Sequence, residues 1–339
     1  MKKKHSICII GGSGYIGSSL AEGLLKEGYE IKIFDLRPPK SNKLKSMTTF
    51  MKGDIRSFSQ VKEAIKDCDI VIHTAIIQIP LVNYYKREGF EVNVQGTINV
   101  CKAIEEYESI KGMILTSTWH VYGEYCLMEV IDEKYAYRPD YTEERARFYA
   151  LSKSAQEIIV RLFSEFSQKY YVIFRLGTVL GEGMSPRTVA SIFIDKGIRG
   201  DPLTPFKHSM YRPMFYVDIR DIVKIVKKAV VKILTRKLPK GKSSLDTIYN
   251  VLYPEPITII ELAKIIKKVI YEETNGKINP LIEIVDKGSE DLIHSADKKQ
   301  IFKINIKKTE STFNIKFSNP RETLKRLIRK KLKLQYYDY

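Results

Sequence analysis

Short apolar runs alternate with amphipathic stretches through the first half of the chain. The runs have the length and composition of buried strands and occupy Ile7–Ile10, Ile31–Phe34, Phe50–Arg56 with its turn, Asp69–His73, Gly112–Ser117 and Tyr171–Leu176. Apolar residues at helical spacing lie between them, from Ser18 onwards and over Val61–Cys68, Glu91–Tyr107 and Arg145–Tyr170. Strands and helices that alternate in this way predict an α/β fold, a Rossmann-like, doubly wound parallel sheet with helices on both faces.

The pattern changes after Gly177, where glycines and prolines divide the chain into loops and short elements. The α/β style returns with a strand at Phe215–Val217 and a helix at Ile219–Leu234, and a polar, basic connector follows over 237–244. We therefore expect a first domain over 1–177 and a smaller, mixed C-terminal region over 178–339, of which about 212–235 returns to the first domain.

Two further helices are predicted in the C-terminal region. Thr258 and Glu261 have the spacing of a capping box for a helix over Thr258–Tyr271. The stretch Arg321–Leu334 is a basic amphipathic helix, and its apolar residues are Leu324, Leu327, Ile328 and Leu332. We expect this apolar face to dock on the body of the protein and not on a membrane.

The segment between the first strand and the first helix is rich in glycine. It runs Gly-Gly-Ser-Gly-Tyr-Ile-Gly from Gly11 to Gly17, the pattern of a turn that brings a backbone close to a pyrophosphate at a helix N-terminus. Asp35 ends the second strand, 18 residues after Gly17. A carboxylate there can accept both adenosine ribose hydroxyls, which favours NAD over NADP, although the nearby Arg37 keeps NADP open.

Charge and cysteine usage limit the class of protein. The net charge is +17, and from Asp221 to the end 26 Lys and Arg stand against 14 Asp and Glu. Such a surface could attract nucleic acid or anionic lipid, but the lysines are spread out, which favours solvated helix faces. The four cysteines, at 8, 68, 101 and 126, show no paired spacing, which argues against zinc and disulfides and fits a cytoplasmic protein. No apolar segment is long enough to cross a membrane.

Tyr149 and Lys153 are four residues apart on a predicted helix and so share one face. A neighbouring ammonium and the positive nicotinamide ring of a bound cofactor favour the phenolate and would lower the tyrosine pKa, so that Tyr149 could take a proton from an alcohol. Ser117 and Thr118 end a predicted strand, where an α/β sheet opens to its ligand. Thr118 could hydrogen-bond the reacting hydroxyl, although capping of backbone groups also explains these hydroxyls.

With these pieces, residues from Ile7 to about Asp221 resemble the extended short-chain dehydrogenase/reductase family, most of all its NAD-dependent nucleotide-sugar epimerases and dehydratases. The matching segments are the glycine turn, Asp54-Ile55, Asn93-Val94-Gln95-Gly96-Thr97, Ser117 to Gly123, Tyr149 to Lys153 and Arg212 to Asp218. The resemblance implies cofactor contacts from Gly11, Gly14, Tyr15, Ile16, Gly17, Asp35, Asp54, Ile55, Thr74, Ala75, Asn93, Ser117, Tyr149 and Lys153. It also implies an NAD-binding first domain and a C-terminal region that binds the substrate.

The family mechanism is implied on the same terms. Tyr149 would remove the proton of a sugar hydroxyl, supported by Thr118 and Lys153, while hydride passes to NAD. Substrate contacts would come from Thr118, His120, Thr178, Arg212 and Lys287. Here Thr178 stands where many 4-epimerases have an asparagine. A second phosphate-binding arginine, expected before Asp291, is missing, and Lys287 would take its place.

Departures from the family pattern narrow the expected reaction. Sugar 4,6-dehydratases carry Asp-Glu after the catalytic threonine, whereas this chain has Trp119 and His120, which argues against that reaction. We expect a nucleotide-sugar epimerase, with 4-epimerisation as the first choice. The resemblance also implies a homodimer, whose interface would be built from the helices at 91–107 and 145–170. The alternatives are an NAD(P)H-dependent keto-sugar or carbonyl reductase or dehydrogenase and, more distantly, a cofactor-binding protein that binds nucleic acid.

Overall fold

The computed structural model describes residues 4–125, 127, 130–239, 243–288 and 302–335. Three features named above lie outside the described residues: Cys126, the middle of the basic connector, and the segment that contains Asp291.

A seven-stranded parallel sheet forms the larger lobe, in the order β11-β7-β5-β4-β1-β2-β3. Its strands are β1 (Ser6–Ile10), β2 (Glu30–Asp35), β3 (Thr49–Lys52), β4 (Ile70–His73), β5 (Gly112–Thr118), β7 (Tyr170–Leu176) and β11 (Ile248–Val251). Every residue of β4 and β5 is buried, as expected for central strands covered on both faces. The predicted α/β class and parallel sheet are confirmed.

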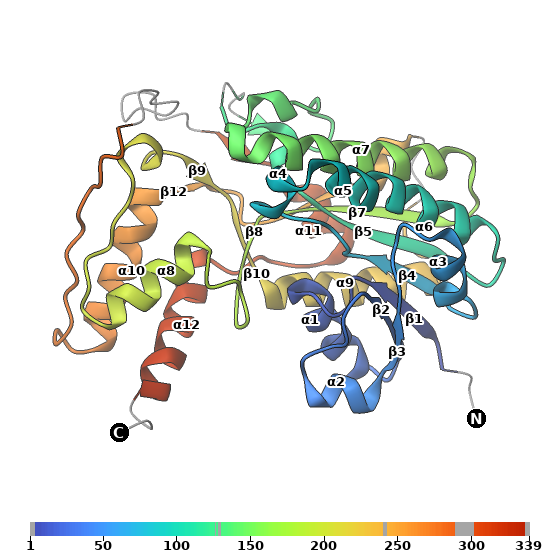
Figure 1. Ribbon diagram of the computed structural model, residues 1–339, viewed down its shortest axis with the longest axis horizontal. Helices are drawn as coiled ribbons and strands as arrows, with labels where there is room; N and C mark the ends of the chain where they lie inside the picture. Colours follow the sequence, from blue (N-terminus) through green and yellow to red (C-terminus); the bar gives the residue numbers. More distant parts are fainter. Residues whose placement is uncertain (1–3, 126, 128–129, 240–242, 289–301, 336–339) are drawn as a thin grey trace.

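Helices cover both faces of the sheet (Figure 1). One face packs against α1 (Tyr15–Leu25), α9 (Ile219–Leu234) and α11 (Lys307–Phe313). The other packs against α3 (Phe58–Ile65), α6 (Gly96–Glu105) and α7 (Glu144–Phe166). Shorter helices lie at the edges and connections: α2 (Asn42–Met47), α4 (Leu81–Tyr84), α5 (Lys86–Phe90), the π-helical turn η1 (Glu91–Gln95), and the 3₁₀ turns η2 (Trp119–Tyr122), η3 (Pro139–Tyr141), η4 (Lys207–Ser209) and η5 (Ser244–Thr247).

Several predicted helix ends are wrong by a few residues. The helix expected to reach Cys68 ends at Ile65, and Asp67 adopts a positive φ of 62° that a helix cannot accommodate. The helix expected to reach Tyr170 ends at Phe166, because Ser167 is extended and Tyr170 already pairs in the sheet. Local apolar spacing does not reveal where backbone pairing takes over.

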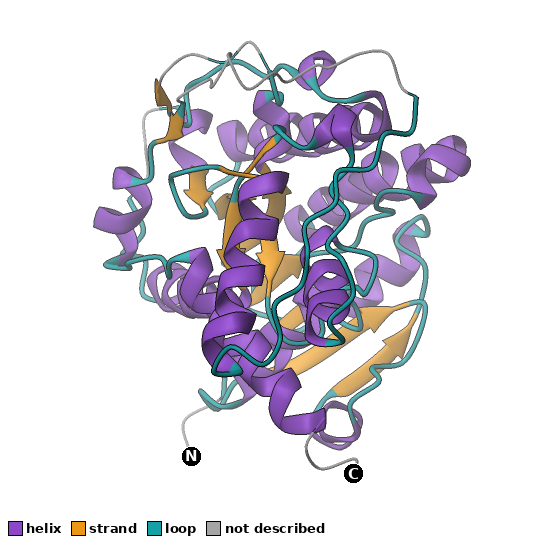
Figure 2. Ribbon diagram, turned by 90° about the vertical axis from the view of Figure 1, so that its left-hand side faces the viewer, coloured by secondary structure: helices purple, strands orange, loops and turns teal. Residues whose placement is uncertain are grey.

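The C-terminal residues build a second, smaller lobe with its own apolar core. It contains α8 (Val189–Ile198), α10 (Ile259–Glu273) and α12 (Pro320–Gln335), which stand in front of the sheet in Figure 2. Short strands pair within or beside it: β6 (Val130–Ile131) with β13 (Lys303–Ile304), β8 (Thr178–Leu180) with β10 (Tyr216–Asp218), and β9 (Pro213–Met214) with β12 (Ile257–Thr258). Among the loops and short elements expected after Gly177, the structure has a ten-residue helix, α8, whose N-cap is Thr188.

Two C-terminal predictions are confirmed and one strand was missed. The Thr258–Glu261 capping box is present at the start of α10. The apolar residues of α12 are buried in the smaller core: Leu324, Leu327, Ile328 and Leu332. The missed strand is β11, which pairs parallel with β7 and forms the seventh strand of the sheet. Of the predicted return at 212–235, helix α9 packs on the large sheet, whereas β10 pairs with β8 in a separate sheet.

Candidate active site

The turn between β1 and α1 has no room for side chains at its glycines. Gly11 has φ +82°, which favours glycine. A Cβ atom on Gly17 would lie 2.3 Å from the carbonyl oxygen of Gly11, and one on Gly11 would lie 2.5 Å from the nitrogen of Ala75. Helix α1 follows from its N-cap Gly14 through Tyr15 with no side-chain cap and no acidic residue in its first turn among the described residues. Its backbone N–H groups can therefore face an anion, and the cradle fits the pyrophosphate of a dinucleotide.

Asp35 lies at the carboxyl end of β2, beside this cradle. Its carboxylate accepts hydrogen bonds from the backbone N–H groups of Ser13, at 3.1 Å, and Arg37, at 3.2 Å. These bonds tie the end of β2 to the glycine turn. A carboxylate beside the turn suits the ribose hydroxyls of NAD.

The end of β4 is tied to the same turn and to α7. The Thr74 hydroxyl donates to the two backbone carbonyls where β1 meets the turn, both at 3.0 Å. Asn93 accepts from the N–H of Ile77 at 2.8 Å, donates to the carbonyl of Ile77 at 3.2 Å, and donates to the hydroxyl of Ser152 at 3.1 Å. The side chains of Thr74 and Asn93 therefore hold the loop after β4 in place, whatever further contact they make with a cofactor.

Asp54 and Ile55 follow β3. The Asp54 carboxylate takes bonds of 2.6 to 3.1 Å from the guanidinium of Arg56, and this hydrogen bonding, more than any other effect, holds the pKa of Asp54 below its usual value. Ile55 is buried against Gly96, where a Cβ atom would lie 2.8 Å from it. The predicted adenine contact stays a prediction.

Helix α7 brings Tyr149 and Lys153 to the carboxyl end of β5. The Tyr149 hydroxyl interacts with the side chain of Thr118, and Lys153 Nζ donates to the carbonyl of Thr116 at 2.7 Å. Burial raises the pKa of Tyr149 to about 12, against the lowering effect of Thr118. Burial lowers the pKa of Lys153 to about 7, with the charge of Glu157 opposing. In the protein alone desolvation dominates both groups, and a lowered tyrosine pKa beside Lys153 and a nicotinamide ring stays a prediction.

His120 extends the site from Thr118 to a carboxylate that the sequence analysis missed. Its Nδ1 lies 3.0 Å from Thr118 Oγ1, and its Nε2 lies 3.4 Å from Oε1 of the fully buried Glu124. Gly123, with φ +89°, lets the chain turn so that Glu124 comes back under the imidazole. The four-residue spacing of a histidine and a glutamate was the signal available, but only the turn brings the two side chains together.

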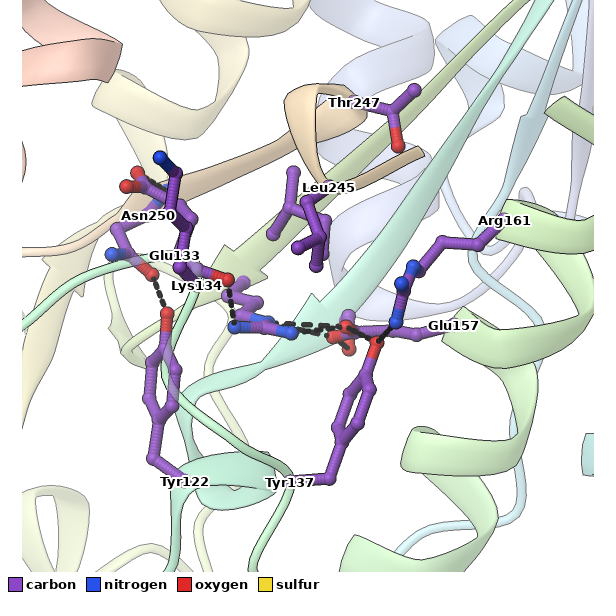
Figure 3. A network of polar contacts seen from close by, with 12 residues as sticks. Tyr122, Glu133, Lys134, Tyr137, Glu157, Arg161, Leu245, Thr247 and Asn250 are labelled. Carbon is purple, nitrogen blue, oxygen red and sulfur yellow. Dashed lines mark hydrogen bonds and ion pairs between the residues drawn. The ribbon is translucent and has the colours of Figure 1, made fainter. Parts of the chain in front are cut away.

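A buried polar network lies behind the strand end (Figure 3). The Ser117 hydroxyl donates to Glu157 at 2.5 Å, and Glu157 is paired with Arg175 of β7 at 2.7 Å. Tyr137 donates to Glu157 at 3.0 Å, so the carboxylate has three partners. The hydroxyl of Ser117 therefore belongs to this network, and a cofactor contact from Ser117 stays a prediction. Arg175 was missed because it lies in an otherwise apolar run.

The predicted substrate residues reach the site to different degrees. Arg212 is buried and pairs with Glu143 at 2.5 Å, and the backbone N–H of Glu143 donates to Glu124 at 2.7 Å. Thr178 is half-buried at the start of β8. Lys287 is exposed with its ammonium 4.1 Å from the ring centroid of Phe206. It joins none of the contacts above in the described part of the chain.

Among the described residues, no group of three or more His, Cys, Asp and Glu side chains is arranged to hold a metal ion. No helix in the described part of the chain is long and apolar enough to cross a membrane. The three described cysteines, Cys8, Cys68 and Cys101, are buried free thiols.

Curated proteins with similar sequences include epimerases and reductases. A putative UDP-glucose 4-epimerase of Methanocaldococcus jannaschii is 32% identical over 57% of this chain and 63% of its own length. The short-chain dehydrogenase/reductase family 42E member 1 of Danio rerio is 36% identical over 35% of this chain and 31% of its own length. The tetraketide alpha-pyrone reductase 1 of Arabidopsis thaliana is 25% identical over 65% of this chain and 71% of its own. The chain thus spans less than two thirds of the first two relatives.

Solved structures share the fold over nearly the whole chain. The UDP-glucose 4-epimerase of Thermotoga maritima, with UDP-glucose, has a TM-score of 0.75 at 20% identity and covers 98% of both chains. The Thermus thermophilus UDP-glucose 4-epimerase complex with NAD has a TM-score of 0.73 at 21% identity and covers 95% of this chain and 97% of that one. Residues 7–250, from β1 to β11, match the family described as NAD dependent epimerase/dehydratase. With a glycine cradle that fits NAD and a match that covers more than half of its length, the chain belongs to the NAD dependent epimerase/dehydratase family of enzymes.

Proposed function

We propose that this enzyme is a nucleotide-sugar epimerase and that a UDP-sugar 4-epimerase is the first activity to test. The observation that carries the proposal is the contact between Tyr149 and Thr118 at the open end of β5, with Lys153 on the same helix. The epimerase relatives and the fold they share support it. The absence of an acidic pair after Thr118 weighs against 4,6-dehydration, because Trp119 and His120 stand there.

In this proposal the site's own residues move and hold one proton. Tyr149, as the phenolate, takes the proton of a sugar hydroxyl, and Thr118 orients that hydroxyl. NAD, when bound, supplies the hydride acceptor. Lys153 donates a hydrogen bond to the Thr116 carbonyl, which it can do as an ammonium or as a neutral amine. In this proposal its amino group lies on the side of the helix that faces the cofactor. Arg212, paired with Glu143, is available to a substrate phosphate if that pair opens.

We further propose that the enzyme is a homodimer. Large apolar side chains form a stripe along the outer face of α7, from Leu151 through Ile158 and Leu162 to Phe166, and the last two are 59% and 65% exposed. Exposed Tyr84 and Phe90 lie on α4 and α5, which contact α7. A stripe of this size on a helix is typical of an interface. It lies on one of the two helices predicted to form the dimer.

The first experiment identifies the cofactor in the protein as purified. We expect mass spectrometry of the denatured protein to find about one NAD per chain, because an epimerase recycles its cofactor within one turnover. Tyr149→Phe should keep that NAD and lose UDP-glucose to UDP-galactose conversion by about a hundredfold or more, the usual contribution of a general base. A Tyr149→Phe enzyme with the wild-type rate would exclude this mechanism.

A reductase or dehydrogenase is the second candidate, favoured by the reductase relatives. Such an enzyme exchanges its cofactor with solution. An empty purified protein that oxidises added NADH or NADPH with a keto-sugar or another carbonyl compound would establish this alternative.

A further inference from the structure

A hydroxyl, an imidazole and a carboxylate follow one another behind Tyr149. A neutral imidazole donates from one nitrogen and accepts at the other. His120 Nε2 faces the Glu124 carboxylate, which can only accept, so Nε2 carries the hydrogen. Nδ1, 3.0 Å from Thr118 Oγ1, then accepts from the threonine hydroxyl, whose oxygen can accept from Tyr149. The Trp119 ring covers the imidazole at 4.4 Å between centroids, and the Tyr149 ring meets it edge-on at 6.1 Å.

Glu124 is held as an anion in a buried place. Burial by itself would raise its pKa, but the hydrogen bonding of His120, the charge of Arg212 and the N–H of Glu143 oppose burial, and the pKa lies below its usual value. Arg145 of α7 adds a second positive charge 4.0 Å away. An anion next to Nε2 stabilises a protonated imidazole more than a neutral one. The Glu124 carboxylate therefore lies where it faces an imidazole that has received a proton.

We propose that His120, positioned and charged by Glu124, stores the proton that Tyr149 gives up to become a base. The proton of the Tyr149 hydroxyl passes to Thr118 Oγ1 as the Thr118 proton passes to His120 Nδ1. One O–H bond breaks at Tyr149, one N–H bond forms at His120, and Thr118 ends as it began. The step turns a neutral pair into a phenolate and an imidazolium without a change in net charge.

This inference rests on the proposed function, in which Tyr149 is the base. Glu124 is then a positioning residue. His120, which stands where the 4,6-dehydratases have a glutamate, gains a chemical role. Lys153 alone is poorly placed to stabilise the phenolate in the protein without substrate, since its amino group donates to the Thr116 carbonyl. The imidazole and its carboxylate supply that stabilisation through Thr118.

The tautomer of His120 tests the arrangement without a substrate. We expect nitrogen NMR of the NAD-loaded full-length protein at neutral pH to show that the His120 imidazole carries its hydrogen on Nε2. The His120 signals are assigned by their absence from the spectrum of His120→Gln. A proton on Nδ1 would mean that His120 donates to Thr118 and cannot receive its proton, which would overturn the proposal. This measurement is decisive even if neither UDP-glucose nor UDP-galactose is a substrate.

The pH dependence of turnover tests the role. Glu124→Gln keeps the shape of the side chain and removes its negative charge. We therefore expect the acid limb of the pH–rate profile to shift to lower pH by about one unit. The plateau rate should fall about tenfold, because a weaker acceptor leaves less phenolate, while bound NAD and KM stay unchanged. His5→Gln is the matched control, since His5 pairs with Asp69 at 3.1 Å outside the site. A Glu124→Gln profile that coincides with wild type would overturn the proposal, whereas an active Tyr149→Phe would overturn the proposed function itself.

Discussion

His73, the last residue of β4, shows how strongly position changes a side chain's chemistry. It is fully buried, and its Nε2 lies 3.0 Å from the hydroxyl of Thr97. That hydroxyl donates to the carbonyl of Asn93 and receives a bond from Gln156, so it accepts from His73. Burial, followed by the charge of Lys153, lowers the pKa of His73 to about 3. The ring is thus neutral in the folded protein at every physiological pH.

This residue predicts a pH dependence of stability. Between about 3 and the ordinary value of 6.5, the unfolded chain binds the proton that folded His73 refuses, so the free energy of unfolding falls as the pH falls through that window. His73→Gln removes the titrating group. We expect the slope of unfolding free energy against pH, between about pH 4 and 6, to decrease by ~1.4 kcal/mol per pH unit in urea denaturation. An unchanged slope would contradict the buried neutral state.

At the scale of an element, glycines determine the backbone path of the turn between β1 and α1. Helix α7 has two faces with different contacts. The inner face of α7 carries Tyr149, Lys153 and Glu157 toward β5 and β7, while its outer face carries the apolar stripe. The turn before α1 requires a residue without a side chain at position Gly17, because no Cβ atom fits against the carbonyl of Gly11.

Gly17→Ala should therefore abolish cofactor retention. Its Cβ would lie 2.3 Å from a backbone oxygen, so the turn must open and its N–H groups must move. We expect the purified variant to contain less than a tenth of the wild-type NAD by mass spectrometry. Ser19→Ala in the same helix, which loses only a local bond to the Tyr15 carbonyl, should keep its NAD and controls for the stability of α1. Normal NAD content in Gly17→Ala would refute the assigned cradle.

At the scale of the whole molecule, the larger and the smaller lobe lie next to each other (Figure 1). Asp218 joins them, because it caps α9 of the larger lobe and accepts bonds from Thr323 at 3.0 Å and Arg326 at 2.9 Å on α12. The apolar stripe on α7 is exposed and so is available to a second copy of the chain.

A charge in the stripe should separate the proposed dimer. Leu162→Glu places a carboxylate in the middle of the outer face of α7, and burying it in a partner would cost several kcal/mol. We expect the wild type to sediment as a dimer and Leu162→Glu as a monomer in analytical ultracentrifugation. Val231→Glu, at an exposed apolar position on α9, should remain dimeric. A monomeric wild type would refute the homodimer.

Much of the fold and part of the site could be predicted from local sequence. The alternation of strands and helices, the glycine turn, the Thr258–Glu261 box and the buried face of α12 are each encoded by neighbours within a few residues. The spacing of Tyr149 and Lys153 on one helix is of the same kind. These features follow from helical and strand periodicity and from backbone sterics, which act on short segments.

Only the tertiary structure decided what depends on residues far apart in the chain. The four residues of β11 became a strand because the edge of β7 was available to pair with them. Ser117 gave its hydroxyl to Glu157, and Arg175 became buried in an apolar run, because the carboxylate of α7 neutralises it there. The pKa of Tyr149 in the protein alone lies above its ordinary value, since desolvation depends on everything packed around the ring. The sequence by itself determined the elements and the chemical groups, and packing between distant segments determined which groups touch and how they ionise.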